Sequence, residues 1–220
     1  MPYRYTLGAL RTHLLQARDI NLVVDVGASE GLWARDLRKA GYSGDILSLE
    51  PLSEPFGRLQ ARTRRDPRWR CERVAVGGSS GTLTMNVSRQ TGWSSPLPLL
   101  ELTARAAPLA TYVSHESVPV RTLDEILEAD GEADTPLAIK VDVQGFEYAV
   151  LDGAGSSLTR CQLLDIELSL VPLYEGQRLW REMVDRIEQL GFQTAWVESC
   201  RFVDPGTRSA LQLNLLFLRP

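Results

Sequence analysis

Two segments that share the residues Val-Asp-Val constrain the fold of this chain more than any other feature. The first, VVDVGASEG, covers residues 23–31, and the second, KVDVQGFE, covers residues 140–147. Each begins as a short apolar run rich in β-branched residues, reaches a glycine and is followed by a helical pattern. Strands that are apolar on both faces belong to parallel sheets covered by helices on both sides. The chain is therefore predicted to be an α/β protein with a mostly parallel sheet.

The same alternation of helices and strands continues along most of the 220 residues. The pattern predicts helices over residues 6–18, 32–41, 53–64, 123–129, 146–154 and 176–190, and strands over residues 21–27, 45–51, 70–76, 137–143, 163–170, 193–199 and 211–218. A polar, hairpin-like piece is predicted near residues 82–88. No helical pattern separates the last two strands, which predicts a closing antiparallel hairpin.

Residues 88–116 interrupt this rhythm with Gly, Pro and Ser. A connection of this length in a compact domain is typical of a lid or insertion over a functional site. The length and the apolar content allow one substantial core, so we expect a single domain over residues 1–220, with an N-terminal helix within residues 1–20.

Charge and composition make several classes of function improbable. The formal net charge is −4, which provides no general field for a phosphate backbone, so no nucleic-acid partner is expected. Cys71, Cys161 and Cys200 are far apart and form no paired metal-binding spacing. The sequence shows neither a signal core nor an apolar run long enough to span a bilayer, so we expect a cytoplasmic protein without a membrane span.

Gly27, Gly31 and Glu50 form the pattern of a Rossmann-like nucleotide site. The two glycines follow the first strand, and Glu50 closes the next one, where a carboxylate accepts hydrogen bonds from ribose hydroxyls. A dinucleotide fingerprint would need glycine at the positions of Ser29 and Leu32. The missing pyrophosphate cradle disfavours a nicotinamide-dependent oxidoreductase, which remains an alternative.

S-adenosylmethionine suits this loop better than a dinucleotide. It has an adenosine ribose but no pyrophosphate, and its cationic sulfonium and amino groups suit a pocket edged by Asp25 and Glu50. The stretch GASEG also matches the nucleophile elbow of hydrolases, with Ser29 as nucleophile. A triad in that order would depend on His115, and no oxyanion-hole motif precedes the elbow, so a hydrolase is the weaker interpretation.

Six motifs along the chain together resemble one known family. In chain order they are VVDVGASEG, LSLEP, RVAVGGSSGTLTM, LAIKVDVQGFEYAVLDGA, LDIELSLVPLYEG and LGF. The order and content are similar to the FkbM family of S-adenosylmethionine-dependent methyltransferases over residues 20–220. The resemblance implies a class I, Rossmann-like methyltransferase with the strand order 3-2-1-4-5-7-6. It also implies methyl transfer to a small hydroxylated acceptor, mostly a sugar, a glycolipid or a secondary metabolite.

The resemblance also assigns cofactor-binding positions. These are Asp25, Gly27, Ala28, Ser29 and Gly31 in the first loop, Glu50 and Pro51 after the second strand, Ala75 and Val76 on the adenine side, and Asp142. Two positions depart from the family pattern. Ser29 stands where asparagine is common, and Asn214 stands where the last strand often has aspartate, so no role is carried over to that strand.

Asp142 and Glu167 are the candidate catalytic pair. In the implied strand order their strands are neighbours, about 4.8 Å apart, and their carboxylates face the crevice at the carboxyl ends of the strands. Two roles are open for them. They bind a divalent cation such as Mg²⁺, which acidifies the acceptor hydroxyl, or their repulsion raises one pKa so that this carboxylate removes the hydroxyl proton.

Two charged residues near this pair have structural interpretations. Lys140 lies in an otherwise apolar strand, so we expect an internal ion pair with Asp25 or Asp142. Glu147 lies in the first turn of the following helix, where a carboxylate either caps the helix or contacts the acceptor.

The segment 88–116 adds further candidates. His115 is a third candidate catalytic residue, as a general base. Trp93 and its neighbouring serines are candidate cover for the substrate. The sequence identifies neither the acceptor nor the oligomeric state, and a non-catalytic cofactor-binding protein of the same fold remains an alternative.

Overall fold

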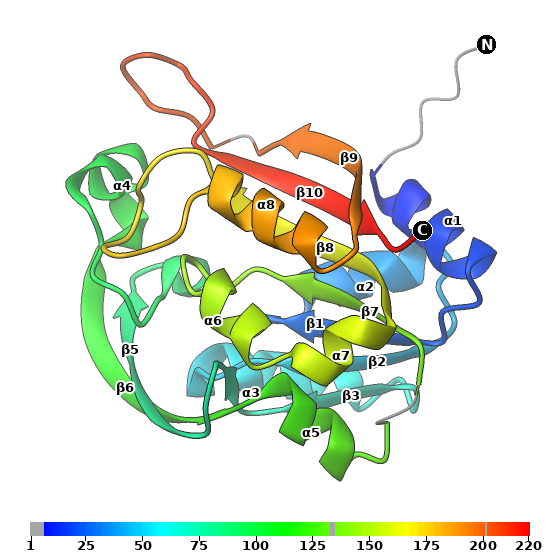
Figure 1. Cartoon of the computed structure of the whole chain (residues 1–220). Coiled ribbons are helices and arrows are strands. Elements are labelled where there is room, and N and C mark those ends of the chain that lie inside the picture. Colours follow the sequence, from blue (N-terminus) through cyan, green and yellow to red (C-terminus); the bar gives the residue numbers. More distant parts are fainter. Residues whose placement is uncertain (1–6, 133–134, 201) are drawn as a thin grey trace.

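A seven-stranded sheet forms the centre of the molecule (Figure 1). The computed structural model describes residues 7–132, 135–200 and 202–220. The strands lie in the spatial order β3 (Trp69–Glu72), β2 (Asp45–Leu49), β1 (Leu22–Val26), β7 (Leu137–Val141), β8 (Cys161–Ser169), β10 (Gln212–Leu218) and β9 (Gln193–Ser199). Numbered within this sheet alone, the order is 3-2-1-4-5-7-6, which confirms the predicted fold. Strand β10 runs antiparallel to both neighbours, which confirms the predicted closing hairpin.

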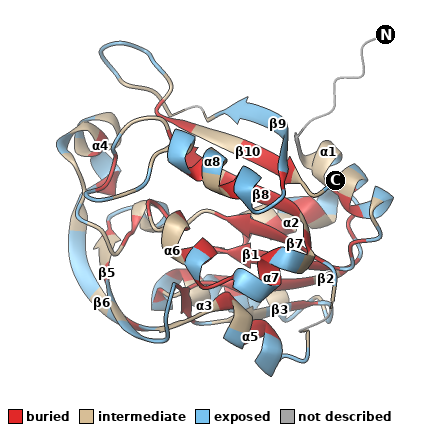
Figure 2. Cartoon of the chain, viewed as in Figure 1, coloured by how far each residue is buried: buried red, intermediate tan, exposed pale blue. Residues whose placement is uncertain are grey.

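Helices cover both faces of this sheet (Figure 1). One face carries α1 (Leu7–Ala17), α2 (Leu32–Lys39) and α3 (Ser53–Thr63), and the other carries α5 (Leu123–Ala129), α6 (Glu147–Asp152), α7 (Gly155–Arg160) and α8 (Trp180–Gln189). Val23 packs on the face covered by α1, α2 and α3, whereas its neighbour Val24 packs on the face covered by α5, α6, α7 and α8. Successive side chains of a strand point to opposite faces, so a central strand here is enclosed on both faces and is mostly apolar. Every residue of β1 is accordingly buried (Figure 2).

A smaller, three-stranded sheet has the order β4 (Ala75–Val76), β6 (Tyr112–Arg121) and β5 (Gly81–Ser88). Strand β6 is parallel to β4 and antiparallel to β5, so the predicted hairpin-like piece near residues 82–88 is a strand. The strand predicted over residues 70–76 is divided between the two sheets, as β3 and β4.

The last part of residues 88–116, the segment predicted as a lid, is a strand rather than part of a lid. Residues 112–116 form the first half of β6, while helix α4 (Glu101–Ala106) and two 3₁₀ turns, Thr91–Trp93 and Pro108–Ala110, lie before it. Strand β6 packs Val118 and Val120 inward, and its other face is exposed. A strand with only one apolar face and several polar residues resembles a loop when its sequence is considered alone.

The carboxyl ends of β1, β2, β7 and β8 meet at one edge of the main sheet because these strands run parallel. That edge brings Gly27, Glu50, Asp142 and Glu167 into one region. At the lateral edge of the sheet, every residue of β9 is exposed (Figure 2). No helix in the described ranges is both long and apolar enough to cross a membrane.

Candidate active site

The loop after β1 has an unusual backbone conformation. Gly27, Ser29 and Gly31 have φ values of 75°, 48° and 77°, which lie in the left-handed region. A Cβ atom on Gly27 would stand 1.9 Å from the carbonyl oxygen of Asp142, so residue 27 must be glycine for space as well as for conformation. Asparagine, which is common at this position in the family, tolerates the left-handed region because its side-chain amide can hydrogen-bond locally. Ser29 lacks that amide.

Glu50 fixes this loop from the next strand. Its Oε2 accepts a hydrogen bond from Ser29 N at 2.8 Å, and its Oε1 accepts one from Leu52 N at 2.9 Å. Burial raises the pKa of Glu50 to about 7, although both backbone donors oppose the shift. The carboxylate therefore joins the ends of β1 and β2 and also lines the cavity described next.

A cavity of about 630 Å³ opens at this edge of the sheet. Its lining residues come from the two loops and from the smaller sheet: Gly27, Ser29, Glu50, Pro51, Leu52, Ala75, Val76, Leu83, Met85, Thr91, Gly92, Ser94, Pro96, Asp142, Val143, Gln144 and Phe146. Seven predicted cofactor positions are among them: Gly27, Ser29, Glu50, Pro51, Ala75, Val76 and Asp142.

Three other predicted cofactor positions do not line this cavity. The side chain of Asp25 is fully buried beneath the loop, because the strand that carries it is enclosed on both faces. Ala28 packs in the apolar layer beside α2. A Cβ atom on Gly31 would stand 2.7 Å from Leu59 Cδ1, so this glycine admits helix α3 rather than a ligand.

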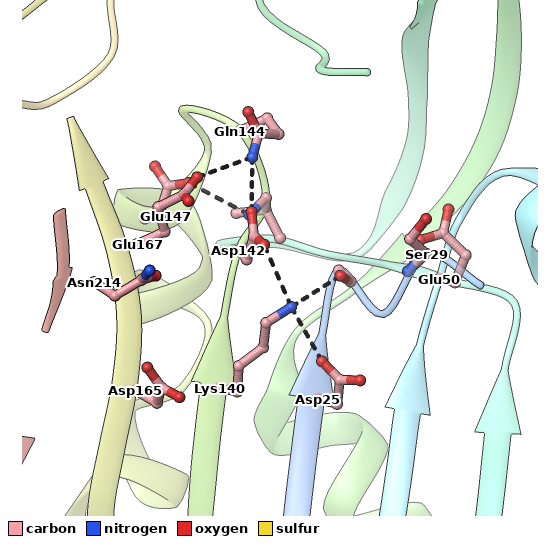
Figure 3. Close-up of polar contacts among 12 residues, drawn as sticks. Asp25, Ser29, Glu50, Lys140, Asp142, Gln144, Glu147, Asp165, Glu167 and Asn214 are labelled. Carbon is pink, nitrogen blue, oxygen red and sulfur yellow. Dashed lines mark hydrogen bonds and ion pairs between the residues drawn. The ribbon is translucent and has the colours of Figure 1, made fainter. Parts of the chain in front are cut away.

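Lys140 holds the base of the site together. Its Nζ lies 3.1 Å from Asp25 Oδ1 and 3.6 Å from Asp142 Oδ2, and it donates a hydrogen bond to Gly27 O at 3.1 Å (Figure 3). The predicted internal ion pair is confirmed, with both carboxylates rather than one. Burial lowers the pKa of Lys140, but the two carboxylates outweigh it and leave the pKa above its ordinary value. Asp25 thus supports the cofactor loop through Lys140.

Asp142 and Glu167 come together across β7 and β8, as the sequence predicted, with an amide between them (Figure 3). Gln144 Nε2 donates to Asp142 Oδ1 at 2.7 Å and to Glu167 Oε2 at 3.1 Å. Gln212 Nε2 also donates to Glu167 Oε2, at 2.7 Å, and Cys200 Sγ donates to Oε1 at 3.4 Å. Burial, followed by the charge of Asp142, raises the pKa of Glu167 to about 8.

The donors around this pair bear on the metal hypothesis. A hard divalent cation takes oxygen ligands, but the amide nitrogen of Gln144 occupies the space between the two carboxylates. In the described part of the chain, no three His, Cys, Asp or Glu side chains are grouped so as to hold a metal ion. The two carboxylates therefore share an amide donor rather than an oxygen-lined space for a cation.

Glu147 serves the turn that follows β7. Its Oε1 accepts hydrogen bonds from Gly145 N at 3.0 Å and from Val143 N at 3.3 Å. The side chain is buried, and burial raises its pKa to about 7. Of the two predicted roles, the structure supports the capping of the turn, because Glu147 lines neither cavity.

His115 is not part of the site. It lies on the exposed face of β6, opposite Asn86, and lines neither cavity. We therefore remove it from the candidate catalytic set. The hydrolase interpretation loses its base as well, because no histidine of the described residues lines the cavity that contains Ser29.

Trp93 packs against Phe202, with their ring centroids 4.6 Å apart, and does not line the first cavity. Its neighbour Ser94 does line it, and Ser95 Oγ donates to the carbonyl oxygen of Gln144 at 2.7 Å. Within residues 91–96, the first cavity is thus lined by Thr91, Gly92, Ser94 and Pro96, and substrate cover by this segment remains a prediction. Composition gave no signal for Leu83, Met85 and Phe146, whose apolar side chains enter the cavity through tertiary contacts alone.

A second cavity, of about 660 Å³, lies on the other side of Asp142. It is lined by Arg11, Trp33, Lys140, Val141, Asp142, Asp165, Glu167, Glu198 and Asn214. Asp142 is the residue that its lining has in common with that of the first cavity. Asn214, the departure on the last strand, therefore faces this second space, and its Nδ2 lies 3.2 Å from Cys200 Sγ.

The reversed β10, the glycine loop after β1 and the acid closing β2 define a Rossmann-like, S-adenosylmethionine-dependent methyltransferase. Residues 25–194 match the methyltransferase FkbM domain, and the chain belongs to that family.

Two relatives of known activity share part of this sequence. The chain is 25% identical over 166 residues to the hexuronic acid methyltransferase AglP of Haloferax volcanii, a match that covers 72% of this chain and 60% of AglP. It is 27% identical over 172 residues to the 2-O-methyltransferase NoeI of Sinorhizobium fredii, which covers 74% of this chain and 70% of NoeI. The chain thus spans less than two thirds of the length of AglP.

Solved structures show the same fold at low sequence identity. An rRNA methylase from Streptococcus thermophilus superposes with a TM-score of 0.53 at 11% identity, covering 99% of this chain and 98% of that one. Magnesium protoporphyrin IX methyltransferase (ChlM) from Synechocystis, with bound S-adenosylmethionine, gives a TM-score of 0.51 at 12% identity, covering 97% and 78%. These similarities establish the fold alone.

Proposed function

We propose that the protein transfers a methyl group from S-adenosylmethionine to a hydroxyl oxygen of a small polyhydroxylated acceptor, such as a sugar. One observation carries this proposal: Asp142 lies on the wall between two cavities, and its side chain is 36% exposed. A carboxylate with access to both spaces can face the methyl donor on one side and the acceptor hydroxyl on the other.

The first cavity fits the methyl donor. Glu50 is placed to accept hydrogen bonds from ribose hydroxyls, and Val76, Leu83, Met85 and Phe146 offer apolar surface to an adenine ring. No pyrophosphate cradle is required. When S-adenosylmethionine is bound, its sulfonium supplies the activated methyl group, and the carboxylate of Asp142 suits a neighbouring positive charge.

Asp142 is the proposed general base. The hydroxyl of a sugar is a weak nucleophile, so its proton must leave as the oxygen attacks the methyl carbon. Glu167 is the proposed supporting residue instead, because Gln144, Gln212 and Cys200 already engage its oxygens. Lys140 keeps the nearest oxygen of Asp142 in place through their ion pair.

The acceptor class has support from the relatives. AglP is a hexuronic acid methyltransferase, and NoeI is a 2-O-methyltransferase. The second cavity, with Trp33, four carboxyl side chains and the amide of Asn214, has the mixture of aromatic surface and hydrogen-bonding groups that a polyhydroxylated ligand requires. A nucleic-acid acceptor is not proposed, because the net charge is −4.

Two measurements test this function. Isothermal titration of the folded protein with S-adenosylhomocysteine should show one binding site, and absence of binding would remove the methyltransferase proposal. Incubation with methyl-labelled S-adenosylmethionine and glucose, glucuronic acid or glucosamine should then place the label on an oxygen. Label on the glucosamine nitrogen would contradict O-methylation.

A further inference from the structure

Gln144 occupies a strained position in the turn after β7. Its φ is 53°, in the left-handed region that glycine adopts most readily, and only 8% of the residue is exposed. The next residue, Gly145, also has a positive φ, of 96°, so glycine stands at one of two consecutive left-handed positions in this turn and Gln144 at the other. A buried non-glycine residue in this conformation requires compensation from its side chain, and such strain clusters at functional sites.

The side chain of Gln144 makes three contacts that fix its orientation. Nε2 donates to Asp142 Oδ1 and to Glu167 Oε2, at 2.7 and 3.1 Å. Oε1 accepts a hydrogen bond from Tyr174 Oη at 2.9 Å. The reverse orientation would direct the amide oxygen toward two carboxylates that offer no donor when ionised, so the nitrogen must face the acids.

The backbone of Gln144 also contacts the cofactor cavity's cover. Its carbonyl oxygen accepts a hydrogen bond from Ser95 Oγ at 2.7 Å. Ser95 is fully buried and lies within residues 91–96, four of which line the first cavity: Thr91, Gly92, Ser94 and Pro96. One residue therefore connects both acids with the segment over the methyl donor.

We infer that Gln144 is a positioning residue that orients the carboxylate of Asp142 for proton removal and couples this orientation to the segment 91–96. The inference rests on the proposed function. Oδ1 of Asp142 accepts the amide hydrogen bond at 2.7 Å, whereas Oδ2 has only the longer ion pair with Lys140, at 3.6 Å, so Oδ2 is the oxygen assigned to receive the proton. In the transfer step the acceptor's O–H bond breaks, the new bond forms between that oxygen and the methyl carbon, the carbon–sulfur bond breaks with its electrons returning to sulfur, and the proton passes to Oδ2.

Four possible replacements each lack part of what this position requires. Glutamate would add a third carboxylate without a donor, asparagine is one methylene shorter, and leucine has similar volume but no hydrogen-bonding group. Glycine would relieve the left-handed strain while removing the amide. Replacement by glycine therefore separates the structural cost of this residue from its positioning role.

The test compares Gln144→Gly with Arg208→Gly, which relieves the same kind of strain (φ 62°) at an exposed residue that lines neither cavity. The titration of Glu167 is followed by ¹³C NMR of the side-chain carboxyl groups in the folded protein, which needs no acceptor. Loss of the amide donor from Gln144 should move the apparent pKa of Glu167 upward by roughly one unit. The same titration in Arg208→Gly should match that of the unchanged protein.

Activity and binding complete the test. In Gln144→Gly, kcat should fall by roughly 10- to 100-fold, part of what a general base contributes. The dissociation constant of S-adenosylhomocysteine should stay within about three-fold. Gln144→Asn, which accepts the left-handed conformation but cannot span both acids, should share the NMR shift.

An unchanged Glu167 titration in Gln144→Gly and Gln144→Asn would overturn the inference, as would a loss of activity explained by an equal loss of cofactor affinity. Failure of the proposed function has a different signature, because the unchanged protein would then fail to bind S-adenosylhomocysteine.

Discussion

The carbonyl oxygen of Asp142 lies 1.9 Å from the point where a Cβ atom on Gly27 would stand. Strands β1 and β7 therefore approach so closely at their carboxyl ends that residue 27 has no room for a side chain. The same approach places the proposed base beside the cofactor loop. The close packing of β1 against β7 and the position of Asp142 in the site thus both depend on the contact between Gly27 and Asp142.

Gly27→Ala should destabilise the fold and weaken cofactor binding. The left-handed φ and the clash with a backbone oxygen together cost roughly 2 to 5 kcal/mol. Gly41→Ala is a matched control, because its φ is 100° but nothing lies within 4 Å of the added atom. Denaturant unfolding and titration with S-adenosylhomocysteine measure both effects, and equal losses in the two variants would contradict the packing argument.

Asp142→Asn should abolish most of the methyl transfer. Removal of a general base lowers kcat by about 10²- to 10⁴-fold. The asparagine amide keeps the size of the side chain, so affinity for S-adenosylhomocysteine should stay within a few-fold. Glu167→Gln should lower kcat less, because Glu167 is proposed to support rather than to act. Near-normal turnover of Asp142→Asn would exclude it as the base.

Chelation should leave turnover unchanged. The space between Asp142 and Glu167 contains an amide nitrogen, which a hard cation does not accept as a ligand. The rate is measured after exhaustive dialysis against a strong chelator and again after addition of Mg²⁺. Loss of activity that Mg²⁺ restores would replace direct base catalysis with the cation-assisted route.

The stability of the protein should decrease as the pH rises from about 5 to about 8. Burial raises the pKa of Glu50 and Glu147 to about 7 and that of Glu167 to about 8, whereas the unfolded chain loses these protons near the ordinary glutamate value. The folded state therefore binds more protons in this window. Each group contributes a loss of up to about 1.4 kcal/mol per pH unit.

Glu147→Gln provides the specific check on this pH dependence. Glutamine retains an oxygen to accept hydrogen bonds from Val143 and Gly145 but no longer titrates. The fall in unfolding free energy between pH 5 and pH 8 should become shallower than in the unchanged protein. The exposed Glu182 serves as control, and Glu182→Gln should leave the slope as it was.

The sequence predicts the main sheet because its central strands are buried on both faces. The runs around Val24, Leu47, Ile139 and Ile166 are mostly apolar, and this pattern has few structural interpretations. Lys140 in such a run implies a buried partner, and the structure supplies Asp25 and Asp142. The ion pairing of a buried lysine can thus be predicted from one sequence.

Features that depend on tertiary contacts were missed or misplaced. Strand β6 has one exposed face, so its polar residues resemble part of a lid, and the sequence alone does not show that His115 lies on that exposed face. The sequence predicts Asp25 at the cofactor, but the enclosed strand directs its carboxylate toward Lys140. The sequence gives no signal for Gln144, because its contacts are with Tyr174 and Ser95, both distant in sequence.

The shared wall at Asp142 also determines how ligands enter and leave. The two cavities have no other lining residue in common, so the methyl donor and the acceptor need not pass through the same opening. Under the proposed function, this separation predicts that S-adenosylmethionine and the acceptor can bind in either order, with the carboxylate of Asp142 between them.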